Sequence, residues 1–266
     1  MLKYRFEVIN EGVSRLYVPF ESVATSVFLV KSMSGYILID CATTKDDVND
    51  IIIPAIRAEG IGLSSIRYIL LTHRHSDHAG GLDELIKHIP KAVVGMSRLA
   101  SERMPGYKCT GFDDGNTIDN TLTTYLLPGH TDDCMGYYHI PTKSIISGDC
   151  VQQYGIGKYG CGLEYPSMYR RTLERLLADE DIENIITSHE YTPLGDSDYG
   201  REAYEAHIEC CIEYDELIRE FLEACSADGV TDAKEIERLF KETYSEFLPG
   251  ILMLPERTIK GYLEGR

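Results

Sequence analysis

One stretch of the chain constrains both its fold and its chemistry. The apolar run 69–71 leads directly into a cluster of metal-ligand residue types that ends at two glycines: His73, His75, Asp77 and His78, then Gly80 and Gly81. The apolar run predicts a buried strand, and the glycine pair predicts a turn into the next element. Imidazole and carboxylate are the usual nitrogen and oxygen ligands of divalent metal ions. We therefore expect a metal site at the exit of this strand, with an ordinary polar loop as the alternative.

The spacing within the cluster divides its members between two ions. His73 and His75 are two residues apart, so both point the same way from extended backbone and can share one metal ion. Asp77 and His78 are adjacent, so their side chains diverge and can reach a second ion nearby. A helical H-E-x-x-H zinc site would need histidines four residues apart, and the cluster lacks that spacing.

The composition limits the classes of partner. The chain has 266 residues, 43% of them hydrophobic, enough for one large domain or one domain with a small appendage. Its 26 basic and 43 acidic residues give a net charge of −17, which argues against binding nucleic acid or an anionic membrane. No run approaches the roughly 18 apolar residues of a membrane span, and we expect no signal peptide. Eight cysteines without a CxxC pair indicate reduced thiols, hence a cytoplasmic protein.

Hydrophobic periodicity predicts alternating strands and helices, followed by a helical final third. Strands are expected at residues 14–20, 23–31, 36–40, 67–71, 91–95, 122–127, 135–140, 144–146 and 182–187. Helices are expected at residues 45–59, 81–88, 166–178, 199–227 and 232–247. Pro54 predicts a kink or a later start in the first helix, and residues 104–120 are expected to form a loop. The apolar segment 250–254 is expected to pack on the main domain, with a substrate pocket or a dimer contact as alternatives.

Three more candidate ligands, His130, Asp149 and His189, each lie within about three residues of the end of a predicted strand. Loops at strand ends are held by a rigid sheet and commonly carry functional sites. Asp40 also ends a strand, where spacing alone favours a turn residue over a carboxylate that orients a ligand histidine. The remaining histidines are not expected to be ligands: His88, His139 and His207.

Taken together, these motifs resemble the metallo-β-lactamase superfamily. They are Thr72-His73-x-His75-x-Asp77-His78, Pro128-Gly129-His130-Thr131, Gly148-Asp149 and His189, with the strand end at Asp40 similar to the first motif of that family. The resemblance covers roughly residues 14–195. It implies an α/β fold class, namely an αββα metallo-β-lactamase sandwich of two mixed sheets faced by helices, with the metals at one edge. We expect a catalytic domain at residues 1–198 and a helical C-terminal extension, residues 199–266, packed on it.

The resemblance also implies two divalent metal ions, with zinc expected and manganese or iron as alternatives. It places three histidines on the first ion, an aspartate and two histidines on the second, and one aspartate as the bridge: His73, His75 and His130; Asp77, His78 and His189; and Asp149.

The chain departs from the patterns of two member groups of this superfamily, and each departure counts against the activity of that group. Zinc β-lactamases of the main subclass carry cysteine where this chain has Asp149, and Cys150 is displaced by one position, which counts against antibiotic hydrolysis. Flavodiiron oxidoreductases carry glutamate at the position of His75, and no flavodoxin-like region follows, which counts against oxygen reduction.

The expected activity is that of a hydrolase in which a metal-bridging hydroxide cleaves a small thioester, lactone or related ester. Metal coordination lowers the pKa of water to about 7, and Asp77 would be the catalytic residue that takes or passes the proton. Residues 188–192 resemble the last-ligand segment of glyoxalase II, a thioester hydrolase, although its basic glutathione-binding pattern is not recognisable here. The alternatives are an iron-dependent sulfur dioxygenase, a phosphodiesterase-type member, and a non-catalytic module, against which the complete ligand set argues.

The expected partner is a small-molecule substrate, and assembly into a homo-oligomer is left open. The loop 154–162 follows Asp149 and is rich in glycine, which allows a substrate to approach closely. Lys158 or Tyr159 would then contact the substrate; a plain surface loop is the equally weighted alternative.

Overall fold

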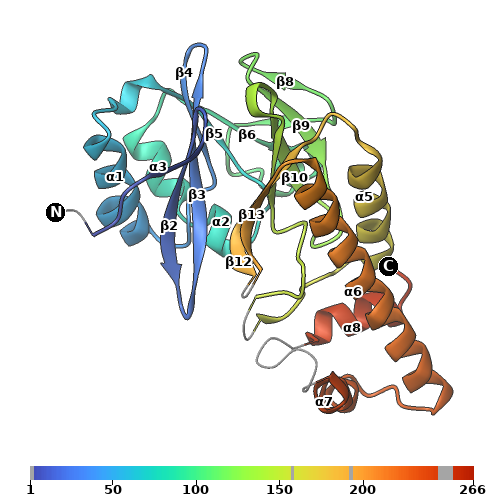
Figure 1. The fold of residues 1–266 in the computed structure, drawn as a ribbon. Coiled ribbons are helices and arrows are strands. Elements are labelled where there is room, and N and C mark those ends of the chain that lie inside the picture. The colour runs from blue at the N-terminus through green and yellow to red at the C-terminus, as the bar shows by residue number, and fades with distance from the viewer. Residues whose placement is uncertain (1–2, 157–158, 192–193, 245–253) are drawn as a thin grey trace. The chain divides into compact units, whose positions relative to one another are not determined.

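The computed structural model describes residues 3–156, 159–191, 194–244 and 254–266, and the chain divides into two compact units (Figure 1). The first unit consists of Met1–Leu126 and Met135–Gly148, and the second of Leu127–Cys134 and Asp149–Arg266. Neither unit is one continuous segment, so each brings together residues that are far apart in the sequence. Among the described residues, no helix is both long enough and apolar enough to cross a membrane.

A seven-stranded mixed sheet forms the body of the first unit. Its strands lie side by side in chain order: β1 (Glu7–Asn10), β2 (Val13–Phe20), β3 (Val23–Ser32), β4 (Gly35–Ile39), β5 (Ile66–Leu70), β6 (Val93–Ser97) and β7 (Cys109–Phe112). Strands β1 to β4 pair antiparallel, whereas β4 to β7 pair parallel. The central strands carry fully buried apolar residues, such as Leu38 and Ile69, as expected where both faces of a sheet are covered.

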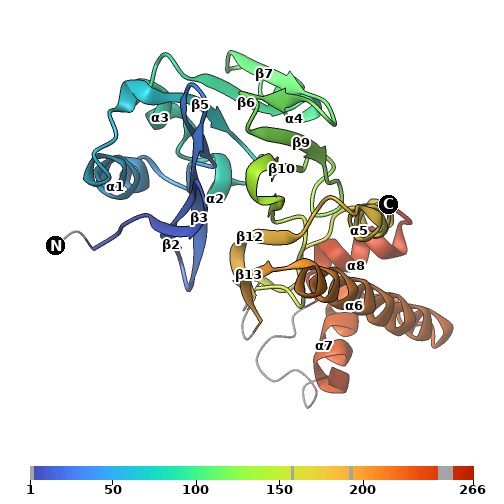
Figure 2. The same ribbon diagram turned by 45° about the horizontal axis from the view of Figure 1, so that its top comes forward.

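Helices in the first unit pack on this sheet, and α1 and α3 lie together on one side of it in both views (Figure 1, Figure 2). The helical segments are η1 (Asp47–Ile52), α1 (Ile53–Ala58), η2 (Leu63–Ser65), α2 (Ser76–Ala79), α3 (Leu82–His88) and α4 (Arg98–Arg103). Apolar side chains from η1, α1, α3 and the sheet share one buried cluster, which includes Val48, Ile52, Ile56, Leu82, Leu85, Leu38 and Ile69.

The helix expected at residues 45–59 is divided in two. Residues Asp47–Ile52 form a π-helix, and α1 follows at once with Pro54 in its first turn. Because proline has no N–H to donate to the preceding turn, the hydrogen-bonding pattern changes beside it. The later start predicted for the α-helix is therefore confirmed.

A second, antiparallel sheet of the first unit has the strand order β11-β10-β9-β8. Its strands are β8 (Thr117–Ile118), β9 (Leu122–Leu126), β10 (Met135–His139) and β11 (Ser144–Gly148), with the short helix η3 (Ile140–Thr142) between the last two. Two hydrogen bonds tie β10 to the chain that leaves β5: Met135 N–H donates to Thr72 O (2.8 Å), and the Tyr137 hydroxyl donates to Leu71 O (2.6 Å). Two hydrogen bonds to β10 therefore hold the backbone directly before the predicted histidine cluster.

The second unit is mostly helical. It contains the antiparallel pair β12 (Asn184–Tyr191) and β13 (Gly195–Tyr199), with the helices α5 (Pro166–Ala178), α6 (Arg201–Ala227), α7 (Ala233–Tyr244) and α8 (Glu256–Leu263). The long helix α6 packs on α5, on both strands and on α8 (Figure 2). The predicted α/β class, with two sheets and a helical C-terminal region, is confirmed. The domain boundary between residues 198 and 199 falls inside this unit and remains a prediction.

Several short elements were not expected from the sequence. Residues 104–120 contain β7 and β8 instead of a continuous loop, and β1, α2, α4, β13 and α8 also lie outside the predicted elements. These segments have only two to eight residues each, too few to establish a hydrophobic period. Their structure depends on neighbours that the periodicity cannot reveal. Of the apolar segment 250–254, all but Leu254 lies outside the described residues.

Candidate metal centre

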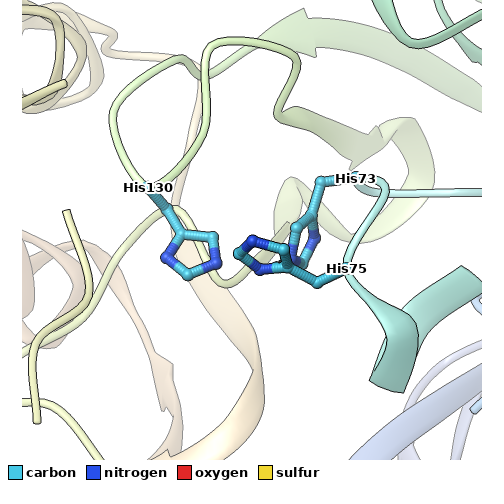
Figure 3. Close-up of side chains that lie close together, drawn as sticks. All are labelled: His73, His75 and His130. Atoms are coloured by element: carbon cyan, nitrogen blue, oxygen red, sulfur yellow. Dashed lines mark hydrogen bonds between the residues drawn. The ribbon is translucent and has the colours of Figure 1, made fainter. Parts of the chain in front are cut away.

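The first two predicted ligands, His73 and His75, lie on the loop after β5, and their side chains contact each other. His73 Nε2 lies 3.1 Å from His75 Nδ1, and the two rings meet edge to face, as Figure 3 shows. His73 is almost completely buried, whereas His75 is partly exposed. The expectation that residues two apart would point the same way is thus met.

The Thr72 hydroxyl determines which ring nitrogen of His73 carries the proton. The Thr72 hydroxyl donates to Asp40 Oδ2 (2.9 Å), so it can accept from His73 Nδ1, which lies 3.1 Å away. A proton on Nδ1 leaves the lone pair of His73 Nε2 pointing toward His75. This is the tautomer that lets His73 bind a metal ion through Nε2.

Asp77 and His78 form the short helix α2, directly after His75. His78 is fully buried, and its Nδ1 lies 2.8 Å from Asp40 Oδ2. The carboxylate can only accept, so the His78 proton sits on Nδ1 and Nε2 carries the lone pair. That Nε2 lies 3.4 Å from Asp77 Oδ2. The expectation that these adjacent side chains diverge is therefore wrong: on the helical backbone of α2 their donor atoms come together, as two ligands of one ion would.

Asp40 is a carboxylate that hydrogen-bonds a predicted ligand histidine and not simply a turn residue, so the interpretation that spacing favoured is wrong. It follows β4 with φ of 63° and accepts from Thr72 N–H at 2.8 Å in addition to the bonds above. The backbone pairing of Asp40 N–H with Leu70 O (2.8 Å) aligns the ends of the neighbouring parallel strands. Spacing could not reveal this role because residues 40 and 78 meet only through the strand order of the sheet.

The glycine pair after the cluster is required by close packing of the backbone. A Cβ on Gly80 would lie 2.1 Å from Thr43 O, and one on Gly81 would lie 2.1 Å from Cys41 O. Cys41 N–H donates to His78 O (2.8 Å), so the segment after Asp40 packs directly against α2. Any larger residue would push α2, and with it His78, away from Asp40.

In the second unit, His130 is held by backbone groups of a distant segment. It lies on the loop after β9 (Figure 3), and its Nδ1 lies 2.5 Å from Gly162 O, which can only accept. His130 Nε2 is thereby left to bind a metal ion. Gln152 contacts both sides of this arrangement: its Oε1 accepts from Gly162 N–H (2.9 Å), its Nε2 donates to Asp149 O (2.7 Å), and the same Nε2 lies 2.9 Å from His130 Nδ1.

Asp149 is shared by two histidines of the second unit. Its Oδ2 lies 3.7 Å from His130 Nε2 and 3.3 Å from His189 Nε2. All three side chains are buried. One carboxylate oxygen near two imidazole nitrogens is the arrangement expected of a ligand that bridges two ions.

The donor atoms within each unit fit a divalent metal. Two ligands of a tetrahedral zinc ion, each about 2.1 Å from it, lie roughly 3.4 Å apart. The pairs His73–His75, His78–Asp77 and His189–Asp149 have donor separations of 3.1, 3.4 and 3.3 Å. Their chemistry is also suitable, because imidazole and carboxylate are ligands that divalent metal ions take.

The family model described as "Metallo-beta-lactamase superfamily" matches residues 22–189 of the chain. The chain belongs to the metallo-beta-lactamase superfamily. The match includes all seven predicted ligands.

Curated relatives share part of the chain. A protein named hydroxyacylglutathione hydrolase from Synechococcus sp. is 30% identical over 150 residues, covering 53% of this chain and 56% of its own. One of the same name from Maricaulis maris is 37% identical over 134 residues, covering 48% and 50%. The chain thus spans about half the length of the curated relatives it matches.

Solved structures share the fold. A metallo-beta-lactamase from Cronobacter sakazakii, a HARLDQ motif mutant, has a TM-score of 0.61 at 20% identity, with 83% of this chain and 98% of that chain covered. The rubredoxin oxygen:oxidoreductase from Desulfovibrio gigas has a TM-score of 0.65 at 19% identity, covering 80% and 62%. At these identities the likeness concerns the fold alone.

Cys150, next to the expected bridging position, is not placed as a ligand. Its Sγ donates to Leu127 O (2.7 Å), and burial raises the pKa of the thiol well above its usual value. The thiol is therefore neutral and directed at a backbone carbonyl, whereas a metal ligand must be a thiolate. Cys150 therefore does not replace the cysteine that zinc β-lactamases of the main subclass carry where this chain has Asp149.

The other three histidines have partners of their own. His139 Nδ1 lies 2.7 Å from Thr142 Oγ1, His207 Nδ1 lies 2.6 Å from Asp198 Oδ2, and His88 Nε2 lies 2.7 Å from Asn49 Oδ1. None of the three belongs to a group of potential metal ligands among the described residues. That these three histidines are not metal ligands remains a prediction.

The sequence did not point to Gln152 or Gly162. Gln152 lies three residues after Asp149, but an isolated glutamine carries no recognisable pattern. Gly162 acts through its carbonyl group, which every residue has. Lys158 of the same loop lies outside the described residues, and the proposed substrate contact of this loop remains a prediction.

Proposed function

We propose that the chain is a dinuclear metal-dependent hydrolase that cleaves a small thioester. The proposed ligands of the first ion are His73, His75 and His130, those of the second are Asp77, His78 and His189, and Asp149 bridges. The observation that carries this proposal is Asp149 Oδ2, which lies 3.7 Å from His130 and 3.3 Å from His189. A single metal ion would not need one carboxylate oxygen beside histidines from two different ligand groups.

The residues around the proposed ligands fix which ring nitrogen of each imidazole carries the proton, and so which nitrogen can bind metal. The Asp40 carboxylate keeps the proton of His78 on Nδ1, and through Thr72 it does the same for His73. The Gly162 carbonyl does so for His130. The cost of orienting the ligands is thus met during folding, so less free energy is lost when metal binds. When bound, divalent ions lower the pKa of water to about 7 and polarise a substrate carbonyl.

Asp77 is the proposed catalytic residue for proton transfer. Its side chain is 12% exposed, and its Oδ2 lies 3.4 Å from both the Thr25 hydroxyl and His78 Nε2. A carboxylate with one oxygen near a metal ligand and limited access to water can accept a proton and pass it on.

A thioester is the proposed substrate because the matched curated relatives carry the name hydroxyacylglutathione hydrolase. Such a substrate has an acyl carbonyl that two metal ions can polarise and a thiolate leaving group that needs little protonation. A reducing cytoplasm is the proposed location, since all eight cysteines are free thiols. Zinc is the proposed metal, because imidazole and carboxylate ligands suit it.

The test measures metal content and hydrolysis on the same preparation. We expect two ions per chain after zinc loading, and hydrolysis of acyl thioesters of glutathione and of coenzyme A above that of matched oxygen esters and lactones. His189→Ala should lose one ion and most of the activity, while His88→Ala, which changes a histidine outside the ligand set, should keep both. Two bound ions without hydrolysis of any thioester would refute the substrate class, and a single ion would refute the dinuclear centre.

A further inference from the structure

The C-terminal helix α8 is connected to the metal ligand His130 through one short segment, residues 161–165. On one side of this segment, Gly162 O accepts from His130 Nδ1, Glu164 N–H donates to His130 O (3.2 Å) and Tyr165 N–H donates to Gly129 O (2.9 Å). The imidazole and the backbone of His130 are therefore both fixed by the same few residues.

On its other side, the segment is held by Thr258 of α8. The Thr258 hydroxyl donates to Cys161 O (2.7 Å) and accepts from Leu163 N–H (2.9 Å). These two bonds bracket Gly162, whose carbonyl faces His130. Thr258 is fully buried, so water does not replace its hydroxyl.

Close packing keeps α8 against this segment. A Cβ on Gly261 would lie 3.0 Å from Glu164 O and 2.8 Å from Pro166 Cδ, and a Cβ on Gly162 would lie 2.1 Å from the Arg257 guanidinium. Arg266 adds a further bond, since Ser167 N–H donates to Arg266 O (2.9 Å). The segment thus lies in close contact with α8, which keeps the Thr258 hydroxyl beside it.

We propose that Thr258 is a positioning residue for the first metal ion, acting through Gly162 on His130. The proposal rests on the proposed metal centre and gives α8 a task in it. Without the Thr258 hydroxyl, Cys161 O and Leu163 N–H lose their buried partner, and the segment moves to satisfy them. The Gly162 carbonyl then no longer holds the proton of His130 on Nδ1. Loss of such an outer partner weakens metal binding by about 10-fold or more.

The experiment compares three variants of the full-length protein. Thr258→Val removes the hydroxyl and keeps the branched shape, and Thr258→Ser keeps the hydroxyl. Tyr262→Phe is the matched control, because it removes a different hydrogen bond of the same helix, that of the Tyr262 hydroxyl to Asp215 Oδ1 (2.5 Å). Zinc affinity is measured for each ion by competition with a chelator, and urea unfolding reports the stability of each variant.

We expect Thr258→Val to weaken one of the two ions about 10-fold and to leave the other within about 2-fold. Thr258→Ser and Tyr262→Phe should bind both as the unsubstituted protein does. In the metal-free proteins, ¹⁵N resonances of the imidazole should show His130 protonated on Nδ1, except in Thr258→Val, where both tautomers are populated.

Unchanged zinc affinity in a folded Thr258→Val variant would overturn the proposal. Equal losses in Thr258→Val and Tyr262→Phe would also overturn it, because helix docking in general, and not the Thr258 hydroxyl, would then be responsible. Failure of the proposed function looks different: both ions bind, Thr258→Val weakens one, and no thioester is hydrolysed. If the unsubstituted protein binds no zinc, both proposals fall.

Discussion

Asp40→Asn tests whether one buried carboxylate sets the metal affinity of the centre. Asp40 accepts from Thr72 N–H, from the Thr72 hydroxyl and from His78 Nδ1, at 2.8, 2.9 and 2.8 Å. Asparagine has nearly the same shape and tolerates the positive φ of 63° at this position. The backbone should therefore keep its conformation, and the change is confined to charge and to one pair of hydrogen atoms.

The amide cannot satisfy all three donors. If its NH2 replaces Oδ2, it faces the N–H of His78; if it replaces Oδ1, it faces the backbone N–H of Thr72. The first orientation forces the His78 proton onto Nε2, where it blocks metal binding, and it also disturbs the Thr72 bond that orients His73. Loss of an outer-shell partner of this kind costs about 10- to 100-fold in metal affinity, or about 1.4 to 2.7 kcal/mol.

The assay is zinc competition against a chelator, with urea unfolding of the metal-free protein measured in parallel. Asp47→Asn is the matched control, because Asp47 also accepts from a backbone N–H, that of Thr44 at 2.8 Å, and lies far from any proposed ligand in sequence. We expect Asp40→Asn to weaken zinc binding within the stated range and Asp47→Asn to leave it unchanged. A folded Asp40→Asn protein that binds two zinc ions with undiminished affinity would refute the reasoning.

Three further predictions concern stability. Gln152→Leu should lower the free energy of urea unfolding by about 1 to 3 kcal/mol, because a backbone N–H and a backbone carbonyl lose their buried partner; an unchanged midpoint would contradict the bonding described. Gly129→Ala should reduce the melting temperature strongly, since its Cβ would lie 2.7 Å from Tyr169 Cα, and normal melting would disprove the close contact. Burial lowers the pKa of His139 to about 4 from 6.5, so the unfolded chain takes up a proton first as the pH falls, and stability should decline between pH 6.5 and 4. His139→Gln should flatten that decline, and an equally steep one would show that other groups cause it.

The proposed ligand set could be predicted from the sequence because metal chemistry requires particular side chains close to strand ends. Three histidines and an aspartate within six residues favour a metal site strongly over a polar loop, and the short distances between His73 and His75 and between Asp77 and His78 are set by local backbone. The longer strands and helices were also predictable, since their apolar residues repeat over enough positions to define a period.

Only the tertiary structure decided what surrounds those ligands. Asp40 reaches His78 because β4 and β5 pair in parallel, and Thr258 reaches the segment beside His130 because α8 folds back across nearly a hundred residues. Neither residue differs in type from many others in the chain, and the groups it contacts include backbone N–H and C=O, which every position offers. A sequence specifies which side chains can bind a metal, whereas the hydrogen bonds that orient them depend on contacts formed only when distant segments pack.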